Sequence, residues 1–452
     1  MSKTKPSLPR GTRDFSPEIM SKRSFIIDII KKNFIKYGFA QIETPAMENL
    51  SVLTGKYGDE GDQLLYKILN SGDFLSKTSK EDIEKGSRHL TTKVSERGLR
   101  YDLTVPLARF VVMNQNEITF PFKRFQIQPV WRADRPQKGR YREFYQCDAD
   151  IIGSKGLWSE VELTLLLTDV FHDLRLEDYI IKINHRAFLF SFAELVGLKY
   201  QTISFCTEID KIDKIGEDRV TENLKALGAN ISQINEVLSL FKENDKGIVL
   251  ERLLNIGVNK EVISNINSYF EALAMSFDKK IKVELDLSLA RGLSYYTGMI
   301  LEVKPTGVQM GSIGGGGRYD DLTGVFGLKG ISGVGISFGL DRIYDVMEEL
   351  KLFPEEIASR PDVLIVHFSE ENLKHAYRIV SGLRDKGIKA ELYPETAGIR
   401  KQFDYSDKIG VPYTLIVGDN EMNSGRYMLK DMKTGNQEPL KMDEVMRRLK
   451  QN

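Results

Sequence analysis

The chain has 452 residues, of which 41% are hydrophobic and 28% charged, with 64 basic side chains against 64 acidic ones. At roughly 150 residues per domain, this length predicts about three domains, or one large domain with additions. The composition excludes collagen-like, disordered and disulfide-framework proteins. Because the charges balance, any nucleic-acid binding must come from local basic patches.

The sequence also predicts where the protein works. No apolar run approaches the roughly 18 residues that a membrane span needs, and residues 1–15 are basic without the apolar core of a secretory signal. We therefore expect a cytoplasmic protein without membrane segments. Cys147 and Cys206 fit neither a C-x-x-C site nor a disulfide framework, so we expect two small buried hydrophobic residues.

The first predicted helix begins at Ser16 and Pro17, which are typical of an N-cap and first helical residue, and ends at Gly38. An extended stretch, residues 39–45, follows it. Alternating and β-branched residues then predict three strands, over residues 99–103, 122–131 and 142–152. The last two strands are close enough in sequence to pair as a hairpin.

Residues 186–280 are mostly helical by pattern and indicate an inserted subdomain, after which apolar alternation resumes over residues 283–289. A glycine-rich segment, 311–317, precedes a helix that starts near Gly339. Beyond a linker, a β-α-β-α-β order predicts a small, partly parallel α/β domain. We therefore expect a first domain made of residues 1–185 and 281–352, a helical insertion over residues 186–280, and a last domain over residues 361–452.

A basic loop connects the two central strands. Between residues 123 and 142 there are seven Lys and Arg side chains against the single acid Asp134, which suits phosphate binding. A solvated hairpin tip would explain the charge equally well if charge were the only signal. On the strand after the loop, Gln146, Asp148 and Asp150 share one face. With about 13 Å between the first and last of these residues, that face is able to hold two ends of a small zwitterion.

Three further polar positions indicate a binding site. Asp102 and Thr104, on a strand face with Arg100, would accept hydrogen bonds from an ammonium group, although an ordinary exposed strand with a Thr cap is the alternative. Arg342 stands in the first turn of its helix, where a cation opposes the helix dipole. An anion bound at that helix start would relieve the conflict.

The glycines do not form a known nucleotide loop. Residues 314–317 lead into Arg318 and Tyr319 instead of Gly-Lys-Ser/Thr, and residues 333–339 do not fit G-x-G-x-x-G. Close packing of strand backbones is the better interpretation. The five histidines form no H-E-x-x-H motif and no Cys/His cluster, so we expect no protein-bound metal site.

Together these segments resemble the class II aminoacyl-tRNA synthetases, and within them the histidyl-tRNA synthetases. Residues 125–153 resemble motif 2 of that class, residues 333–342 motif 3, and residues 39–45 the dimer-forming motif 1. Residues 289–298 and 311–319 are similar to two histidine-specific signatures. The resemblance extends to Pro-Arg-Gly-Thr-Arg-Asp at residues 9–14 and so covers essentially the whole chain.

The resemblance implies an α+β catalytic domain with an antiparallel sheet flanked by helices, a helical insertion and a C-terminal α/β anticodon-binding domain. It implies activation of L-histidine by ATP to histidyl-adenylate and transfer to tRNA(His), by a homodimer. Mg²⁺ would accompany ATP. A carboxylate is already a nucleophile at neutral pH, which explains arginines in place of a catalytic triad.

The residue roles follow from the same resemblance. Arg132 would grip the α-phosphate, Arg342 the γ-phosphate, and Arg291 would stabilise the transition state. The implied ATP-binding residues are Arg132, Asp134, Arg140, Arg142, Arg291 and Arg342. The implied histidine-binding residues are Asp102, Leu103, Thr104, Gln146, Asp150, Tyr295 and Tyr296. Asp102, Thr104 and Gln146 would hold the α-amino group, and Asp150 with Tyr296 the imidazole. Asp102 and Asp134 are shorter than the acids that the family usually carries.

Two other readings compete. A non-catalytic relative, the regulatory subunit of ATP phosphoribosyltransferase or a sensor of histidine or uncharged tRNA, is disfavoured by the complete set of Arg132, Arg291 and Arg342 and by the C-terminal domain. A dinucleotide-dependent oxidoreductase is disfavoured because no strand–GxGxxG–helix unit with an acidic partner is present.

Overall fold

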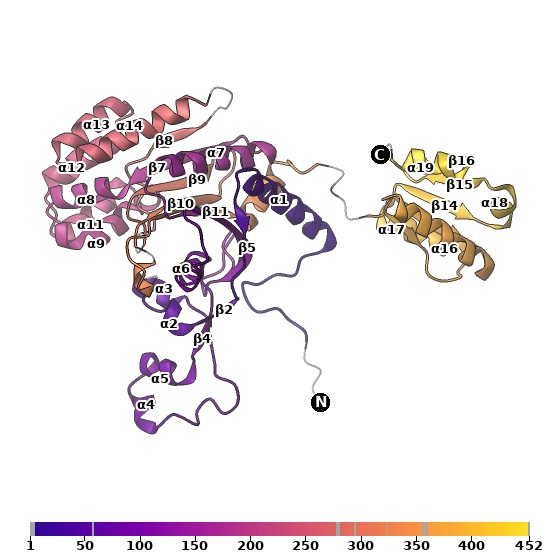
Figure 1. Cartoon of the computed structure of the whole chain (residues 1–452), viewed down its shortest axis with the longest axis horizontal. Helices are drawn as coiled ribbons and strands as arrows, with labels where there is room; N and C mark the ends of the chain where they lie inside the picture. The colour runs from indigo at the N-terminus through magenta and orange to yellow at the C-terminus, as the bar shows by residue number, and fades with distance from the viewer. Residues whose placement is uncertain are drawn as a thin grey trace. The chain divides into compact units, whose positions relative to one another are not determined.

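The computed structural model describes residues 5–56, 58–276, 281–292, 295–321, 323–354, 357 and 360–450. The chain forms two compact units, Met1–Pro354 and Glu355–Asn452 (Figure 1). None of the helices in these described ranges is long and apolar enough to cross a membrane.

An eight-stranded sheet is the centre of the first unit. Its neighbours are antiparallel except for the two outer pairs, β1 with β5 and β7 with β8. In spatial order the strands are β1 (Ala40–Gln41), β5 (Phe122–Trp131), β6 (Glu143–Ile152), β11 (Gly333–Gly339), β10 (Gly314–Tyr319), β9 (Met299–Pro305), β7 (Tyr179–His185) and β8 (Val283–Leu285). The predicted hairpin is confirmed: β5 and β6 pair along their full length.

The hydrophobic core lies on one face of this sheet. Helices α1 (Pro17–Lys36), α7 (Trp158–Asp173) and α15 (Leu340–Glu349) pack there. Cys147 of β6 belongs to this core, and Cys206 is equally buried, as the sequence predicts for both cysteines. The Ser16 hydroxyl accepts a hydrogen bond from the Ile19 amide, so the predicted start of α1 is also confirmed.

The segment 186–276 is helical, and its apolar side chains join the same core as the sheet. Its helices are α8 (Arg186–Leu195), the short 3₁₀ turn η1 (Lys199–Gln201), α9 (Thr202–Ile209), α10 (Ile212–Ile215), α11 (Glu217–Ala226), α12 (Ile231–Phe241), α13 (Lys246–Asn255) and α14 (Lys260–Ala274). Residues 277–280 of the predicted insertion lie outside the described ranges.

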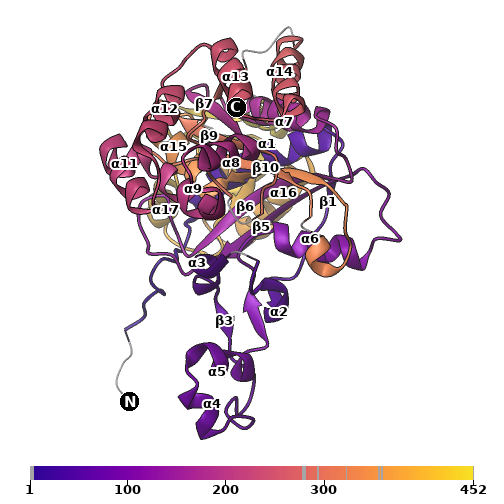
Figure 2. The same cartoon turned by 90° about the vertical axis from the view of Figure 1, so that its left-hand side faces the viewer.

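A smaller three-stranded sheet, in the order β2–β4–β3, stands beside the main one. An arm with α4 and α5 at its end, inserted between β3 and β4, extends away from the main sheet in both views (Figures 1 and 2). The elements are β2 (Met47–Asn49), α2 (Leu50–Leu53), α3 (Gly58–Gln63), β3 (Lys67–Ile68), α4 (Lys80–Glu84), α5 (Ser87–Val94), β4 (Arg97–Leu99) and α6 (Thr104–Met113). A short 3₁₀ turn, η2 (Gly324–Phe326), contacts α6.

Two predicted strands are wrong in extent. The strand expected over residues 99–103 ends at Leu99, because an Asp102 carboxylate oxygen accepts the Val105 amide 3.1 Å away and starts α6 at Thr104. The strand expected over residues 283–289 ends at Leu285, where Asp286 accepts bonds from the amide and hydroxyl of Ser288. In both places a side-chain oxygen that binds nearby backbone competes with the strand ladder.

The second unit has the predicted β-α-β-α-β order. Three parallel strands, β13 (Ala390–Leu392), β12 (Val363–His367) and β14 (Tyr413–Val417), continue into antiparallel β15 (Tyr427–Asp431) and β16 (Gln437–Leu440). The helices are α16 (Glu370–Asp385), α17 (Ile399–Ile409), α18 (Asp419–Ser424) and α19 (Met442–Lys450). The unit buries its own apolar clusters on both sides of the parallel strands.

Candidate functional site

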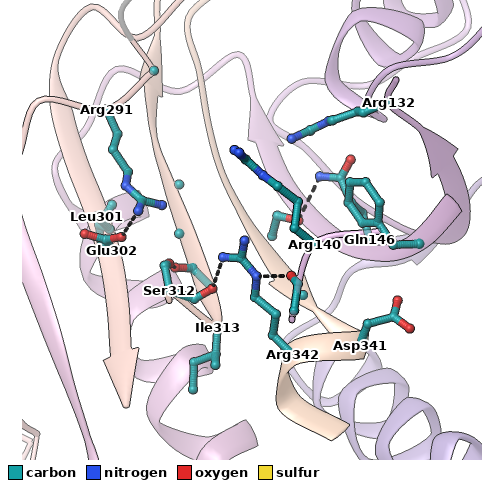
Figure 3. A pocket seen from close by; sticks show the side chains of 18 of the residues that line it. Arg132, Arg140, Gln146, Arg291, Leu301, Glu302, Ser312, Ile313, Asp341 and Arg342 are labelled. Atoms are coloured by element: carbon teal, nitrogen blue, oxygen red, sulfur yellow. Dashed lines mark hydrogen bonds and ion pairs between the residues drawn. The ribbon is translucent and has the colours of Figure 1, made fainter. Parts of the chain in front are cut away.

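A pocket of about 460 Å³ lies on the polar face of the main sheet. Strands β6, β9, β10 and β11, the loop over residues 132–142 (hereafter the basic loop) and the start of α15 form its walls. Among its lining residues are Arg132, Asp134, Arg140, Gln146, Arg291, Tyr295, Tyr296, Glu302 and Arg342. Residues that the sequence placed in four separate segments therefore meet in one cavity (Figure 3).

The floor of the pocket is backbone. Gly314, Gly315 and Gly316 of β10 line it without side chains. A Cβ on Gly316 would lie 2.0 Å from the Gly335 carbonyl oxygen of β11, which is closer than real contacts allow. The close approach of strand backbones that the sequence predicts is therefore present, and it leaves the pocket floor without side chains.

Four arginines give the pocket its charge. Arg132, Arg140, Arg291 and Arg342 all line it (Figure 3). Burial lowers the pKa of the Arg342 guanidinium, and the positive charges of Arg291, Arg140 and Arg132 lower it further. Mutual repulsion of this kind is relieved by a polyanion, so the cavity is suited to phosphates.

Backbone and acidic partners hold these arginines in place. Arg342 donates from Nε to the Gly139 carbonyl and from Nη1 to the Ser312 carbonyl, both at 2.7 Å. Arg291 pairs with the buried Glu302, with Nη2 and Oε1 2.6 Å apart. Arg132 donates to the Tyr101 carbonyl at 3.0 Å. Each guanidinium thus enters the pocket from a fixed anchor.

The two remaining predicted ATP residues lie in the basic loop. Asp134 lines the pocket and pairs with Arg140 at 3.5 Å. Arg142 is not among the lining residues. Its Nε donates to the Asp134 carbonyl at 3.1 Å, so its side chain braces the loop from outside the cavity.

The predicted histidine residues divide into two groups. Gln146, Tyr295 and Tyr296 line the pocket, whereas Asp102, Leu103, Thr104 and Asp150 do not. Gln146 Nε2 donates to the Ser337 hydroxyl at 3.0 Å, and its buried Oε1 has no hydrogen-bond partner. The rings of Tyr295 and Tyr296 lie 4.4 Å apart. Burial raises the pKa of Tyr295 to about 12, with a further contribution from the charge of Asp102.

Asp150 is enclosed behind the pocket wall. It is 3% exposed, accepts a 2.5 Å hydrogen bond from the Tyr319 hydroxyl and pairs with Arg124, whose Nη2 lies 2.5 Å from Oδ2. Burial raises the pKa of Tyr296 well above its usual value, and the charge of Asp150 contributes to this shift. The carboxylate therefore acts on the pocket across a short distance.

The predicted polar strand face of Arg100, Asp102 and Thr104 is wrong. Arg100 turns inward and donates to the carbonyls of Pro129 and Thr44, at 2.8 and 2.6 Å. Because α6 begins at Thr104, the three side chains do not share a strand face. Asp102 lies at the helix start, and Leu103 beside it is fully buried.

Sequence reasoning missed Arg124, Tyr319 and the role of Asp148. The hairpin register pairs Arg124 with Asp150 and Gln126 with Asp148, so counting residues back from the loop would have found the ion pair. The insertion also reaches the pocket, through Asp210 and Lys214. No local pattern marks these two residues, because the contact joins segments far apart in sequence.

Among the residues that the structure describes, no group of three or more His, Cys, Asp or Glu side chains is arranged to hold a metal ion. The cavity carries cations suited to a phosphate chain together with the amide and hydroxyl groups of Gln146, Ser337 and the two tyrosines. Chemically, this arrangement favours bringing a small polar molecule against a polyphosphate.

Comparison with known proteins gives a consistent picture. The family model described as histidyl-tRNA synthetase matches residues 11–343, and that of an anticodon binding domain matches residues 362–452. A curated histidine–tRNA ligase of Cytophaga hutchinsonii is 52% identical over 450 residues, which cover 98% of this chain and 99% of the relative.

Solved structures share the fold. The crystal structure of histidyl-tRNA synthetase from Nostoc sp. PCC 7120 is similar with a TM-score of 0.82 and 28% identity, over 99% of this chain and all of that one. A second similar structure is that of a Bacillus halodurans protein described as ATP phosphoribosyltransferase regulatory subunit/histidyl-tRNA synthetase. Its TM-score is 0.73 and its identity 20%, over 92% of this chain and 99% of that one. At that identity the second likeness concerns the fold alone.

Proposed function

The chain belongs to the histidyl-tRNA synthetase family and attaches histidine to tRNA(His) with the use of ATP, and from this premise we propose which residues hold each substrate. The observation that carries the assignment is the meeting of Arg132, Arg291 and Arg342 in one pocket with Gln146 and the two tyrosines. A regulatory or sensor protein has no need of such a set of cations.

We assign the arginines to ATP. The histidine carboxylate attacks the α-phosphorus and pyrophosphate leaves, so negative charge grows on the phosphate oxygens and no general base is needed. Arg132 and Arg291 stabilise this charge at the α-phosphate, while Arg342 binds the γ-phosphate. Arg140 and Asp134 contact the nucleotide from the basic loop. The repulsion that lowers the pKa of Arg342 supports this assignment, because bound phosphates would remove it.

We assign the other end of the pocket to histidine. Gln146, which lines the pocket, holds the α-amino group, and Asp102, Leu103 and Thr104, which lie outside the lining, support this end from the start of α6. Tyr296, with Tyr295 beside it, binds the imidazole, and Asp150, which lies behind the pocket wall, acts on this end through its charge. The unpaired Oε1 of Gln146 supports this arrangement because a buried acceptor without a partner is costly until a donor arrives.

Mg²⁺ is proposed to accompany ATP. Since no cluster of three ligands was found in the described parts of the chain, the ion would be held mainly by phosphate oxygens and water, as is usual for Mg²⁺. Glu302, which is 2% exposed and reaches the pocket wall, is a carboxylate suited to join it. Bound there, the ion would supply positive charge to the phosphates.

We further propose that the protein is a cytoplasmic homodimer. Support for the dimer comes from residues 39–45, which resemble the dimer-forming motif and include the exposed edge strand β1. We also propose that the first unit comprises a catalytic domain, residues 1–185 and 281–352, with residues 186–280 inserted, and that residues 361–452 bind the anticodon. Light scattering at several concentrations is expected to give twice the mass of one chain, and a monomer at all concentrations would contradict the dimer.

The assignment is tested by exchange of pyrophosphate into ATP without tRNA, with each amino acid offered separately. We expect exchange with histidine alone, because buried polar groups left unpaired reject apolar analogues strongly. Arg291→Gln is expected to lower kcat by about 10²-fold or more, as loss of one charge-stabilising donor does. Arg219→Gln, at an exposed arginine of α11, is the matched control. Exchange with another amino acid would contradict the assigned pocket.

A further inference from the structure

The N-terminal segment, residues 10–15, lies against the basic loop, although none of the chemistry above uses it. The Arg142 amide donates to the Gly11 carbonyl at 2.9 Å, and Arg142 Nη1 donates to the Arg10 carbonyl at 3.3 Å. Gly11 has φ +87°, and a Cβ there would lie 2.9 Å from the side chains of Arg142 and Pro136. Glycine is therefore required for this approach.

Asp341 collects the cations of this segment. Arg13 and, from α1, Arg23 both donate to Asp341 Oδ1, the latter at 2.6 Å. Asp341 Oδ2 accepts the Tyr145 amide at 3.1 Å. The carboxylate is 4% exposed and directly precedes Arg342 in the first turn of α15. Two charged donors on one buried acceptor form a strong and directional anchor.

Arg13 reaches the loop itself from this anchor. Its guanidinium carbon lies 3.3 Å from the centre of the Tyr141 ring, a cation–π contact. The Tyr141 hydroxyl in turn donates to Asp345 at 3.3 Å, and Lys138 pairs with Glu349 at 3.1 Å.

Three acids of α15 thus bind side chains of the basic loop and of the N-terminal segment. Asp341, Asp345 and Glu349 are four residues apart and lie on one face of the helix, which we call the acidic ridge. The outermost pair, Lys138 with Glu349, is exposed and contributes little. The loop tip is therefore held mainly by Arg13, by Tyr141 and by the hydrogen bond that the Arg342 side chain donates to the Gly139 carbonyl.

We propose that Arg13 is a positioning residue for ATP: it clamps the basic loop to the acidic ridge and so sets Arg140 opposite Arg342. The proposal rests on the assignment of that loop to ATP. Arg342 binds the Gly139 carbonyl, one residue from Arg140, so a shift of the loop moves both cations at once. At the histidine end of the pocket, Gln146 of β6 bonds to Ser337 of β11, so this end depends less on the clamp than the basic loop does.

The test is pyrophosphate exchange by Arg13→Gln with Arg10→Gln as matched control, since Arg10 is an exposed cation of the same segment. We expect the KM for ATP of Arg13→Gln to rise about tenfold, because the variant loses one desolvated cation–π and ion-pair contact. The KM for histidine is expected to stay within about twofold of the wild-type value. Arg13→Lys, which keeps the charge but not the flat stacking surface, is expected to recover part of the loss.

Trypsin cleavage of the ligand-free protein gives a second measurement that needs no activity. Lys138 and Arg140 are exposed cleavage sites in the loop. We expect faster cutting there in Arg13→Gln and an unchanged rate in Arg10→Gln. If the wild-type chain exchanges no pyrophosphate with histidine, the assigned function fails while this measurement still tests the clamp.

Two outcomes would overturn the proposal. One is unchanged loop cleavage in Arg13→Gln together with an unchanged KM for ATP. The other is an equal rise in the KM for ATP and for histidine with a lowered melting temperature, which would indicate a general structural role for Arg13.

Discussion

At the scale of single residues, Asp148 is the most unusual group near the pocket. It is 3% exposed and lies between Gln146 and Asp150 on the polar face of β6. Burial raises the pKa of its carboxyl to about 7; Arg124 opposes this shift, and the charge of Asp150 adds to it. Two acids share one buried cation here, so the second acid keeps its proton near neutrality.

This predicts a pH-dependent stability. In the folded protein Asp148 keeps its proton at pH values where the unfolded chain has lost it. The free energy of unfolding therefore falls as pH rises from about 4 to about 7, and the whole loss is present above pH 7. Asp148→Asn keeps the shape without the charge. In thermal unfolding without ligands, the variant is expected to exceed the wild type at pH 8, by on the order of 4 kcal/mol, and to match it near pH 4.

The control for this comparison is Asp404→Asn, at an exposed acid of α17. Its difference from the wild type is expected to stay small at every pH. A difference between Asp148→Asn and the wild type that is the same at pH 4 and pH 8 would show that folding does not raise the pKa of Asp148.

What the sequence predicts at this scale depends on periodicity. Gln146 and Asp150 were placed on one face correctly because residues two apart on a strand share a face. Arg124 was missed because its partner is set by hairpin register, a relation between strands that no single strand displays. The sequence predicts a strand at Asp102, because the bond between its carboxylate and the Val105 amide depends on where the chain turns.

At the scale of elements, long segments were predicted well and short ones poorly. The bounds of β5 and the order of elements in the second unit agree with the sequence. Strands of two or three residues, such as β4 and β8, ended earlier than the apolar pattern suggests. A few backbone bonds hold such strands, so one side chain that binds nearby backbone decides where they end.

Replacement of glycine by alanine is expected to have opposite effects on stability in strand β10 and in helix α16. A Cβ at Gly316 of β10 would lie 2.8 Å from the Ile336 Cα, whereas nothing lies within 4 Å of a Cβ at Gly382 of α16. Gly316→Ala is expected to destabilise the first unit by about 1–3 kcal/mol. Gly382→Ala is expected to stabilise α16 by about 1 kcal/mol, since alanine is the better helix former.

Amide hydrogen exchange in the full-length protein separates the two effects. Faster exchange is expected in β10 and β11 for Gly316→Ala, and slower exchange in α16 for Gly382→Ala. Unchanged protection of β10 in Gly316→Ala would mean that the strands separate without cost, contrary to the close packing described above.

At the scale of the whole molecule, a chain of zero formal net charge must bind a polyanion. Its cations are therefore concentrated, as the seven in residues 123–142 illustrate. The sequence predicts a first domain, a helical insertion and a last domain, and it marks no chemistry in the insertion. The presence of Asp210 and Lys214 at the pocket shows that a segment without motifs still contributes by where the fold carries it.

Local basic patches predict that tRNA binding depends steeply on salt. If about six phosphates are contacted, affinity is expected to fall roughly 10³-fold between about 50 and 200 mM salt, because bound counterions are released. Histidine binding to the same protein is the internal control and is expected to change little. Filter binding across this range measures both, and a tRNA affinity that is independent of salt would contradict the prediction.

The glycine floor of the pocket has a consequence for inhibition. A compound that lay flat on residues 314–316 would rest on main-chain atoms, and an added side chain at position 316 would collide with the neighbouring strand β11. Mutations that confer drug resistance usually work by changing a side chain at the contact. On this wall they would first have to preserve the sheet, so resistance would be confined to the side-chain walls around it.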